Sequence, residues 1–291
     1  MIVATRTQKP FNPVKSALYV VLYALLIFWA VVELYPLVFL FYTALKTDAQ
    51  IMSYPWALPD RPHFENVAEV WSGGTIQVPI PRYLLNSVVI TGLTLLILTV
   101  AGTLAGYALA RYQFPGAGLS QRLFIWALAI PVHATLVPVF LFMGDLGLRN
   151  TYWGIAGLYA AFWLPFTVVV MRAYFESFPR ELEEAARIDG ASRFQAMVRI
   201  VLPLCTPGLL SAGIFAFTLA QNEFLYALIF LAKSEVRTVP VGAITELIRG
   251  DVFYWGQLMA AALLGSVPVA IIYSFFVDYY VAGLTAGAVK N

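Results

Sequence analysis

Six long apolar runs separate the polar segments of this chain, and they constrain its fold more than any other feature. The runs cover residues 17–45, 83–110, 123–143, 151–171, 200–232 and 258–281. A helix needs about 20 apolar residues to cross the ~30 Å hydrocarbon core of a bilayer, and each run is long enough. Because 60% of the residues are hydrophobic, against roughly 45–50% in soluble domains, we predict an all-α polytopic membrane protein with six transmembrane helices.

The polar segments between the runs predict the orientation of the chain. Cytoplasmic loops carry an excess of Lys and Arg. With a cytoplasmic N-terminus, the inside segments hold eleven of the 18 basic residues and the outside segments hold seven. We therefore expect a cytoplasmic N-terminal segment 1–16, a six-span domain 17–281 and a cytoplasmic C-terminal tail 282–291. The two long outside loops either contact a soluble partner or only seal the outer face of the helices.

Composition and motifs exclude several classes of protein. A signal peptide has an apolar core of about 7–15 residues, whereas the run 17–45 is interrupted only by Glu33, so we expect a retained span. The chain has no GxxxxGK[ST] phosphate loop and is not expected to hydrolyse ATP itself. The single cysteine, Cys205, excludes an intrachain disulfide framework and a multi-cysteine metal site. The scattered basic residues predict no nucleic-acid interface.

The charged segment 177–199 lies between the fourth and fifth runs and predicts a helix on the cytoplasmic side. Pro179 suits a first helical turn, because the N–H that it lacks would have no helical partner there. Acidic residues follow at the positive end of the helix dipole, and Gly190 is free to take the positive φ of a helix end. We expect a helix over 179–189, with Ser192 capping a second helix that leads into the fifth run.

The expected helix has one face of small and polar residues. By their spacing of three and four, the residues on this face are Leu182, Ala185, Ala186 and Asp189. Two alanines permit the close approach of a partner, and a rigid helix joined to a membrane span can transmit force. The alternative is an amphipathic helix that rests on lipid, which the weak apolar face disfavours.

The sequence EAARIDGASRFQAMVRIVLPL closely resembles the EAA signature of binding-protein-dependent ABC importer permeases of the carbohydrate type. The signature positions are Glu184, Ala185, Ala186, Gly190, Ile200, Leu202 and Pro203. Further likeness lies in Asn86 and Ser87 and in the motifs AGYALARYQFPG at 105–116, LGLRNTYWGI at 146–155, QNEFLYALIFL at 221–231 and GLTAGAVK at 283–290. The likeness covers nearly the whole chain and is closest to the smaller, MalG-like permease subunit of maltose-type importers.

This resemblance implies a type I ABC importer permease fold, with 177–199 as a cytoplasmic coupling helix. It implies that Glu184 docks on a separate ATPase subunit and that Ala185, Ala186, Asp189 and Gly190 form the contact surface. Two such subunits would bind ATP and Mg, so no cofactor is expected in this chain. The other implied partners are a second homologous permease, an extracytoplasmic solute-binding protein and a carbohydrate substrate. The location would be the cytoplasmic (inner) membrane of a bacterium or archaeon.

Polar residues within the runs are the candidates for the substrate pathway. A charge in mid-membrane costs about 3 kcal/mol, so it normally faces a cavity or a partner. Asn222, Glu223 and Tyr226 offer amide, carboxylate and aromatic groups that suit a sugar, and Glu33 is a candidate for the same cluster. The alternative for Glu223 is an interhelical polar clamp to the partner permease or to the first span. The family often has Trp before the Asn-Glu pair, whereas this chain has Gln221, so the sequence does not determine which residues line the substrate pathway.

Two other functions are alternatives to the ABC importer. An ion-coupled secondary transporter would use Glu33 and Glu223, but it does not explain the charged cytoplasmic helix. A non-transporting structural membrane subunit would not need polar residues in mid-membrane. An enzyme is the weakest alternative, because the sequence shows no paired catalytic residues.

Overall fold

Four long helices form the frame of the protein. The computed structural model describes residues 13–288, and the side chains of residues 17–277 within them. Within that range, four helices are long and apolar enough to cross a membrane. They are α1 (Pro13–Ala44), α4 (Ile80–Arg111), α7 (Tyr152–Ser177) and α14 (Trp255–Ala288).

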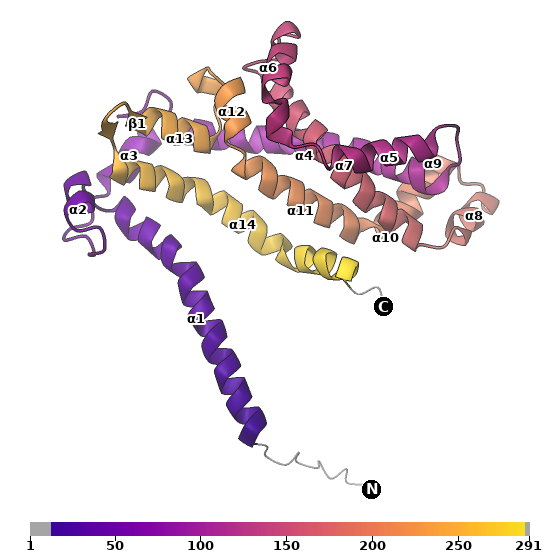
Figure 1. Cartoon of the computed structure of the whole chain (residues 1–291), viewed down its shortest axis with the longest axis horizontal. Coiled ribbons are helices and arrows are strands. Elements are labelled where there is room, and N and C mark those ends of the chain that lie inside the picture. The colour runs from indigo at the N-terminus through magenta and orange to yellow at the C-terminus, as the bar shows by residue number, and fades with distance from the viewer. Residues whose placement is uncertain (1–12, 289–291) are drawn as a thin grey trace.

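Shorter elements connect these helices. In chain order they are α2 (Asp48–Ser53), α3 (Glu65–Ser72), α5 (Ala117–Ala127), the 3-10 helix η1 (Val132–Thr135), α6 (Leu136–Asp145), α8 (Glu181–Ile188), α9 (Arg193–Ala196), the π-helix η2 (Met197–Val201), α10 (Leu202–Leu204), α11 (Thr206–Asn222), α12 (Leu225–Phe230), the 3-10 helix η3 (Ser234–Val236), α13 (Val239–Leu247), β1 (Ile248–Arg249) and β2 (Val252–Phe253). Figure 1 shows α2, α3 and β1 at one end of the long helices and α8 at the other. We call these the α3 end and the α8 end.

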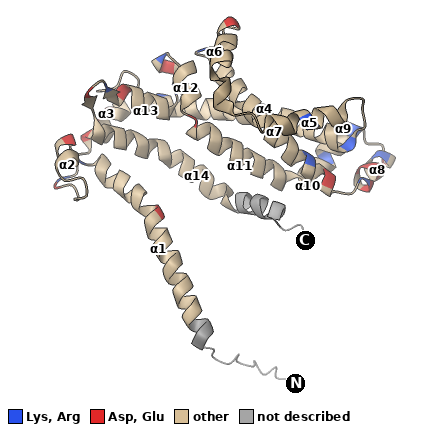
Figure 2. Ribbon diagram, in the orientation of Figure 1, with Lys and Arg blue, Asp and Glu red and all other residues tan. Residues whose placement is uncertain are grey.

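Charged residues gather at these two ends, at the tip of α6 and beside α12 (Figure 2). The long helices between them carry almost none, as the hydrocarbon core of a membrane requires. The helices satisfy their own backbone hydrogen bonds, which is the condition for crossing lipid. The distribution therefore supports a protein that crosses the membrane between its α3 end and its α8 end.

Two of the six predicted spans are bent pairs of helices and not continuous helices. In the third span, α5 meets the segment Val132–Asp145 at 98°, and Pro131 stands directly before η1. In the fifth span, Arg193–Leu204 meets α11 at 74°, with Pro203 and Pro207 on either side of the bend. Proline has no N–H for the helical ladder, which explains both positions. With each bent pair counted as one span, the described chain has up to six.

The ends of the predicted runs also differ from the observed helices. The run 200–232 is interrupted again, because α11 ends at Asn222 and Glu223 has extended backbone before α12 begins. The helix α14 continues past the predicted end at 281 and reaches Ala288. The parts of the predicted terminal segments before residue 13 and after residue 288 lie outside the described residues.

Buried polar residues fix the loop after α12 to the start of α4. The Asn86 Nδ2 donates to two backbone carbonyls of the segment 235–237 at 2.9 and 2.8 Å, and its Oδ1 accepts from the Tyr152 hydroxyl at 2.7 Å. The Ser87 Oγ accepts from the backbone N–H of Val239 at 3.0 Å. Because Asn86 is fully buried, these bonds replace those it would make to water. The Asn-Ser pair of the sequence therefore has a structural role.

The longest helix contact runs between α4 and α7. A Cβ atom at Gly102 would stand 2.5 Å from the Cγ2 of Thr167. A Cβ atom at Gly106 would stand 2.9 Å from the Met171 Cβ and 3.0 Å from the backbone N of Arg172. Helices in lipid associate through such close packing, since burial in lipid gives no hydrophobic driving force. The two glycines therefore set how closely α4 and α7 approach.

We expect Gly106→Ala to destabilise the protein by about 1–3 kcal/mol, because the added methyl group overpacks a contact with backbone that does not yield. The matched control is Gly92→Ala on the same helix, where an added Cβ meets no atom within 4 Å. Alanine at that exposed position is neutral or stabilises by up to ~1 kcal/mol. Thermal unfolding of the two purified variants in detergent measures the difference, and equal stability would contradict the close contact.

Candidate functional site

A short capped helix, α8, stands at the α8 end. It begins at Glu181, so Pro179 precedes the helix and does not lie within its first turn as predicted. Gly190 takes the predicted positive φ, at 90°. The Ser192 side chain accepts from the backbone N–H of Gln195, whose side chain accepts from the N–H of Ser192. The structure therefore confirms the predicted order, in which a helix ends at Gly190 and Ser192 caps the helix that follows.

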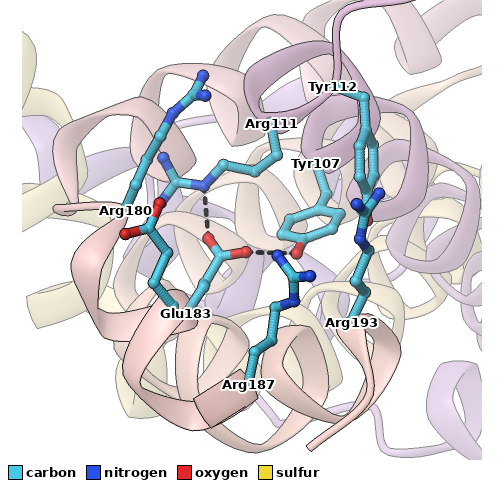
Figure 3. A pocket seen from close by; sticks show the side chains of 8 residues that line it. Tyr107, Arg111, Tyr112, Arg180, Glu183, Arg187 and Arg193 are labelled. Atoms are coloured by element: carbon cyan, nitrogen blue, oxygen red, sulfur yellow. Dashed lines mark hydrogen bonds and ion pairs between the residues drawn. The ribbon is translucent and has the colours of Figure 1, made fainter.

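Glu183 ties α8 to the end of α4 (Figure 3). Its Oε1 accepts from the Arg111 Nε at 2.6 Å, and its Oε2 accepts from the Tyr107 hydroxyl at 2.6 Å. The Arg111 Nη2 also donates to the carbonyl of Phe178 at 3.1 Å, just past α7. The side chains of Arg111 and Glu183 are only 6% and 14% exposed, so either charge would be poorly solvated without the other. These bonds join α4, α7 and α8 into one unit.

Sequence reasoning missed this role of Glu183 and treated it as one of three acids at the start of a helix. A signal for it exists in Tyr107 and Arg111, which lie one helical turn apart at the end of α4 and share a face. The sequence does not say which acid they meet, because that depends on how α8 packs.

The outward surface of α8 and its C-terminal turn consists of eight exposed residues. They are Glu181, Leu182, Glu184, Ala185, Arg187, Ile188, Asp189 and Gly190. Ile188 is 86% exposed, although it is apolar, and sequence reasoning gave it no role. Ala186 is only 7% exposed and faces the protein's own core. The expectation that Ala185 and Ala186 share a partner-facing surface is wrong, because neighbours on a helix point about 100° apart.

The chain continues from α8 through α9 and η2 into α10. Met197 and Val201 of η2 are buried and pack in one cluster with Met171 and Phe175 of α7 and with Tyr107 of α4. π-Helical turns are rare and occur frequently at functional sites. The α8 end is therefore one packed block that carries α8 on its outside.

Glu223 lies in the break between α11 and α12. Its Oε1 accepts from the backbone N–H of Tyr226 at 2.8 Å. Its Oε2 accepts from the backbone N–H of Ala227 at 2.9 Å and from the Tyr159 hydroxyl at 2.6 Å. The Tyr226 hydroxyl donates in turn to the carbonyl of Val132 at 2.6 Å. Glu223 therefore caps α12 and fixes it to α7, while Tyr226 reaches the bend of the third span.

These bonds favour a polar clamp over a sugar site for Glu223 and Tyr226. A carboxylate with three donors and a tyrosine that is 1% exposed have little hydrogen-bonding capacity left for a substrate. The sequence alternative placed this clamp against the partner permease or the first span. In the structure Glu223 instead binds Tyr159 on α7 of the same chain. The clamp therefore holds two broken spans to one another.

Asn222 and Gln221 line an open groove between α11, α13 and α14. The groove has a volume of about 670 Å³ and a mainly apolar lining that includes the hydroxyl of Ser266. Among the described side chains and backbone, the exposed Asn222 side chain donates only to the carbonyl of Thr218, one turn back in its own helix, at 2.8 Å. Of the predicted pathway residues in the fifth span, Asn222 is the one that remains accessible to a ligand.

Glu33 does not join this cluster. The helix α1 contacts α14 near Ala44 and diverges from the other helices toward its N-terminal end (Figure 1). The side chains of residues 17–38, Glu33 included, are exposed in this chain. A further copy or another subunit is needed to cover them if they are not to face lipid.

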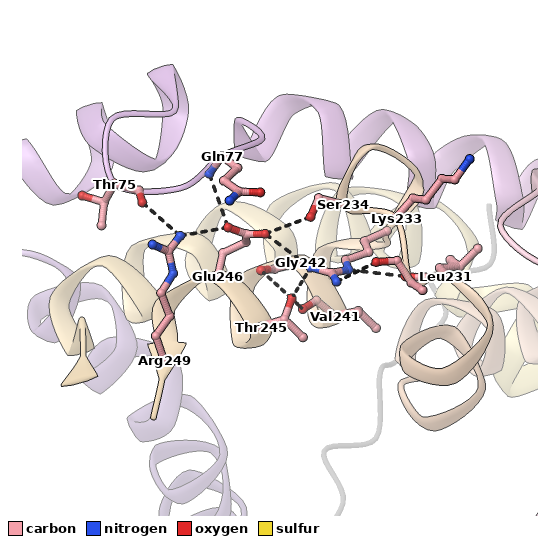
Figure 4. Close-up of polar contacts among 12 residues, drawn as sticks. Thr75, Gln77, Leu231, Lys233, Ser234, Val241, Gly242, Thr245, Glu246 and Arg249 are labelled. Atoms are coloured by element: carbon pink, nitrogen blue, oxygen red, sulfur yellow. Dashed lines mark hydrogen bonds and ion pairs between the residues drawn. The ribbon is translucent and has the colours of Figure 1, made fainter. Parts of the chain in front are cut away.

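A buried ion-pair network joins the loops 46–82 and 233–257 at the α3 end (Figure 4). Glu246 of α13 is 5% exposed and accepts from Arg237 at 3.3 Å and from Arg249 at 3.0 Å. It also accepts from the Ser234 hydroxyl at 3.1 Å and from the backbone N–H of Gln77 at 3.4 Å. The network gives this end of the protein an ordered surface.

Lys46 is buried at the start of the loop 46–82. Its Nζ donates to the carbonyls of Tyr54 and Pro55 at 3.1 and 3.0 Å and lies 4.9 Å from the centre of the Tyr42 ring. Burial lowers the pKa of Lys46, and the nearby carboxylate of Asp60 opposes this shift. These contacts fold the loop back onto the end of α1.

A family model described as the binding-protein-dependent transport system inner membrane component matches residues 99–285. This chain belongs to that family. The matched range contains α8 with Glu183 and Glu184, the Glu223 clamp and the residues of the groove. The site residues of this permease therefore lie within the part that the family shares.

Named relatives extend the match over most of the permease. The sulfoquinovosyl glycerol transport system permease protein SmoH of Agrobacterium fabrum is 37% identical over 89% of each chain. The trehalose/maltose transport system permease protein MalG of Thermococcus litoralis is 36% identical over 91% of this chain and 94% of its own. A crystal structure of a bacterial ABC transporter involved in the import of the acidic polysaccharide alginate aligns with a TM-score of 0.80 at 22% identity, over 94% of this chain and 100% of the other. The fold is that of a type I ABC importer permease.

We expect Glu223→Ala to destabilise the permease by about 3 kcal/mol, because three buried or partly buried donors lose a charged acceptor. The matched control is the neighbouring Asn222→Ala, which removes one bond within a single helical turn and is expected to change stability by less than about 0.5 kcal/mol. Thermal unfolding in detergent measures both variants. If they unfold at the same temperature, Glu223 is not a clamp.

Proposed function

We propose that the chain is the permease subunit of a carbohydrate importer and that α8 receives the movement of a separate ATPase. The observation that carries this proposal is the construction of α8. It is a short helix that ends before Gly190 and has an exposed outer surface, and its inner side is fixed by Glu183 to Arg111 and Tyr107. A helix that rested on lipid would expose a wide apolar face. In α8 the exposed apolar residues Leu182, Ala185 and Ile188 are instead flanked by the exposed charged residues Glu181, Glu184 and Arg187.

The same geometry supports a route for the movement. Closure of two ATPase subunits that bind ATP and Mg would displace α8 through contacts to Glu184, Ala185 and Ile188. The Glu183–Arg111 pair would carry this displacement to α4, and the packed η2 would carry it to α10 and α11. The α8 end then lies in the cytoplasm together with both termini, as the distribution of basic residues predicts.

The substrate class rests on the relatives and on the groove. Two relatives are named for sulfoquinovosyl glycerol and for trehalose and maltose. The groove beside α11 is lined by Gln221, Asn222 and Ser266, whose amide and hydroxyl groups suit sugar hydroxyl groups. The Gln221 Nε2 already donates to the Thr91 hydroxyl and the Ser266 hydroxyl to the carbonyl of Leu263, so Asn222 is the most available of the three. It is open along one side, so a second homologous permease would complete the pathway. An extracytoplasmic binding protein would deliver the carbohydrate at the α3 end.

The ion-coupled alternative receives no support from the same residues. Glu223 is held by three donors, and Glu33 lies on the diverging helix α1. An ion site needs carboxylates that converge on a shared cavity. A structural subunit without a pathway would not explain the groove lined by Gln221 and Asn222.

Glu184→Lys tests the docking of α8. We expect carbohydrate-stimulated ATP hydrolysis to fall at least about tenfold, because a lysine replaces the docking carboxylate at the contact. The measurement uses the chain assembled with the permease and ATPase subunits of its own transporter. The control Arg122→Glu reverses an exposed charge on α5, outside α8 and away from the α3 end, and is expected to leave the activity unchanged. Carbohydrate uptake by the chain alone in vesicles, driven by an ion gradient, would contradict the proposal.

Glu183→Gln separates docking from coupling. We expect the ATPase subunits to remain bound, while carbohydrate uptake falls about tenfold, because α8 loses its charged bond to α4. The ATPase rate and uptake are measured in the same vesicles, so that hydrolysis without transport can be seen. Tyr107→Phe, which removes one hydrogen bond from the same carboxylate, is expected to give a smaller loss. Unchanged uptake per ATP in Glu183→Gln would show that this pair does not transmit the movement.

A further inference from the structure

Four arginine side chains from three segments converge beside α8 (Figure 3). They surround a small cavity of about 150 Å³ that is open to the surface. Arg111 comes from the end of α4, Arg180 and Arg187 come from α8 and the residue before it, and Arg193 opens α9. The coupling proposed above uses only Arg111 of these four.

The charges around this cavity do not balance. Four guanidinium groups face two carboxylates, those of Glu183 and Glu184. The carboxylate of Glu183 is already engaged by Arg111 and Tyr107 at 2.6 Å each. Like charges held near one another repel, and the repulsion is stronger where protein excludes water. An anion between the arginines would remove this repulsion.

The arginines also retain unused donors. A guanidinium group has five N–H donors, and Arg180 uses one of them for the carbonyl of Ala110 at 3.3 Å. The Arg193 guanidinium stacks on the ring of Tyr112 at 5.4 Å, which leaves its edge available. Among the residues that the structure describes, the Arg187 side chain makes no hydrogen bond or ion pair. The cavity is therefore rich in planar donors that fit the oxygens of a phosphate group.

The cavity lies at the depth where two membrane helices end. Arg111 is the last residue of α4, and α7 ends at Ser177, one residue before the Phe178 carbonyl that Arg111 contacts. Tyr107 and Tyr112 line the same place, as tyrosine commonly does at the boundary between membrane and water. Basic pockets between helices at this boundary bind anionic lipid headgroups.

We propose that this arginine cavity binds a phosphate group, supplied by the headgroup of an anionic phospholipid or by a free phosphate. Arg187 and Arg193 hold its oxygens from the side of α8 and α9, and Arg111 holds them from α4. A bound phosphate links the coupling helix to α4 next to the Glu183–Arg111 pair. Binding of phosphate at this cavity can be tested independently of the proposed transport function, because the experiment measures binding to the purified chain and not transport.

The test measures binding to the delipidated full chain in a neutral detergent. The probes are short-chain phosphatidylglycerol, short-chain phosphatidylcholine and inorganic phosphate, each followed by titration calorimetry. We expect saturable binding of phosphatidylglycerol and its displacement by inorganic phosphate. Arg187→Gln is expected to weaken this binding about tenfold, because one charged donor pair is lost. Phosphatidylglycerol that binds much more tightly than phosphate identifies a lipid as the source, and equal affinities identify a soluble phosphate.

Arg122→Gln provides the matched control. Arg122 is an exposed arginine of α5 outside the cavity, so its loss changes net charge equally and is expected to alter binding less than about twofold. Both variants should unfold at the wild-type temperature, since Arg187 makes no contact that stabilises the fold. Equal weakening by the two variants would overturn the proposal, as would the absence of saturable binding.

A third outcome would also overturn it. If Arg187→Gln leaves the binding of both phosphate probes unchanged and instead prevents co-purification of the ATPase subunits, the cavity receives an acidic side chain of a partner protein.

Discussion

The contact between α4 and α7 is the one on which the rest of this permease depends. Gly102 and Gly106 bring the two helices so close that a methyl group at either position would overlap the neighbour. In lipid this packing stabilises the pair without any gain from hydrophobic burial. Several of the polar contacts described above have at least one partner on this pair. Asn86 and Tyr152 meet at its α3 end, and Arg111 meets Glu183 at its α8 end.

Broken helices are tolerated because these ties secure them. The third and fifth spans bend at prolines, which leaves backbone groups without helical partners. At the second break of the fifth span, between α11 and α12, Glu223 supplies acceptors for the first N–H groups of α12. Tyr226 donates to a carbonyl in the bend of the third span. Both are held against α7 through Tyr159. The break between α11 and α12 is therefore held in place by hydrogen bonds, while the groove beside it, which Asn222 lines, stays open.

The α8 end combines an exposed surface with a buried attachment. Glu184 and Ile188 face outward, whereas Glu183 and Ala186, their neighbours in sequence, face the protein. This division lets one short helix contact a partner and stay joined to α4. The arginine cavity lies beside the attachment, so an anion bound there would act on the same joint.

The sequence by itself determined the class of fold, the helix boundaries near Gly190 and Ser192, and the signature that identifies the family. These features are local, because they follow from runs of apolar residues, from the φ that glycine permits and from caps that bond within three residues. Only the tertiary structure decided that Glu183 and not Glu184 meets Arg111, that Ala186 turns inward, that Glu223 binds Tyr159, and that Glu33 stands apart. Each of these depends on how helices distant in sequence are rotated and placed against one another. Within a long apolar helix every face resembles the next, so the sequence contains no signal for that rotation.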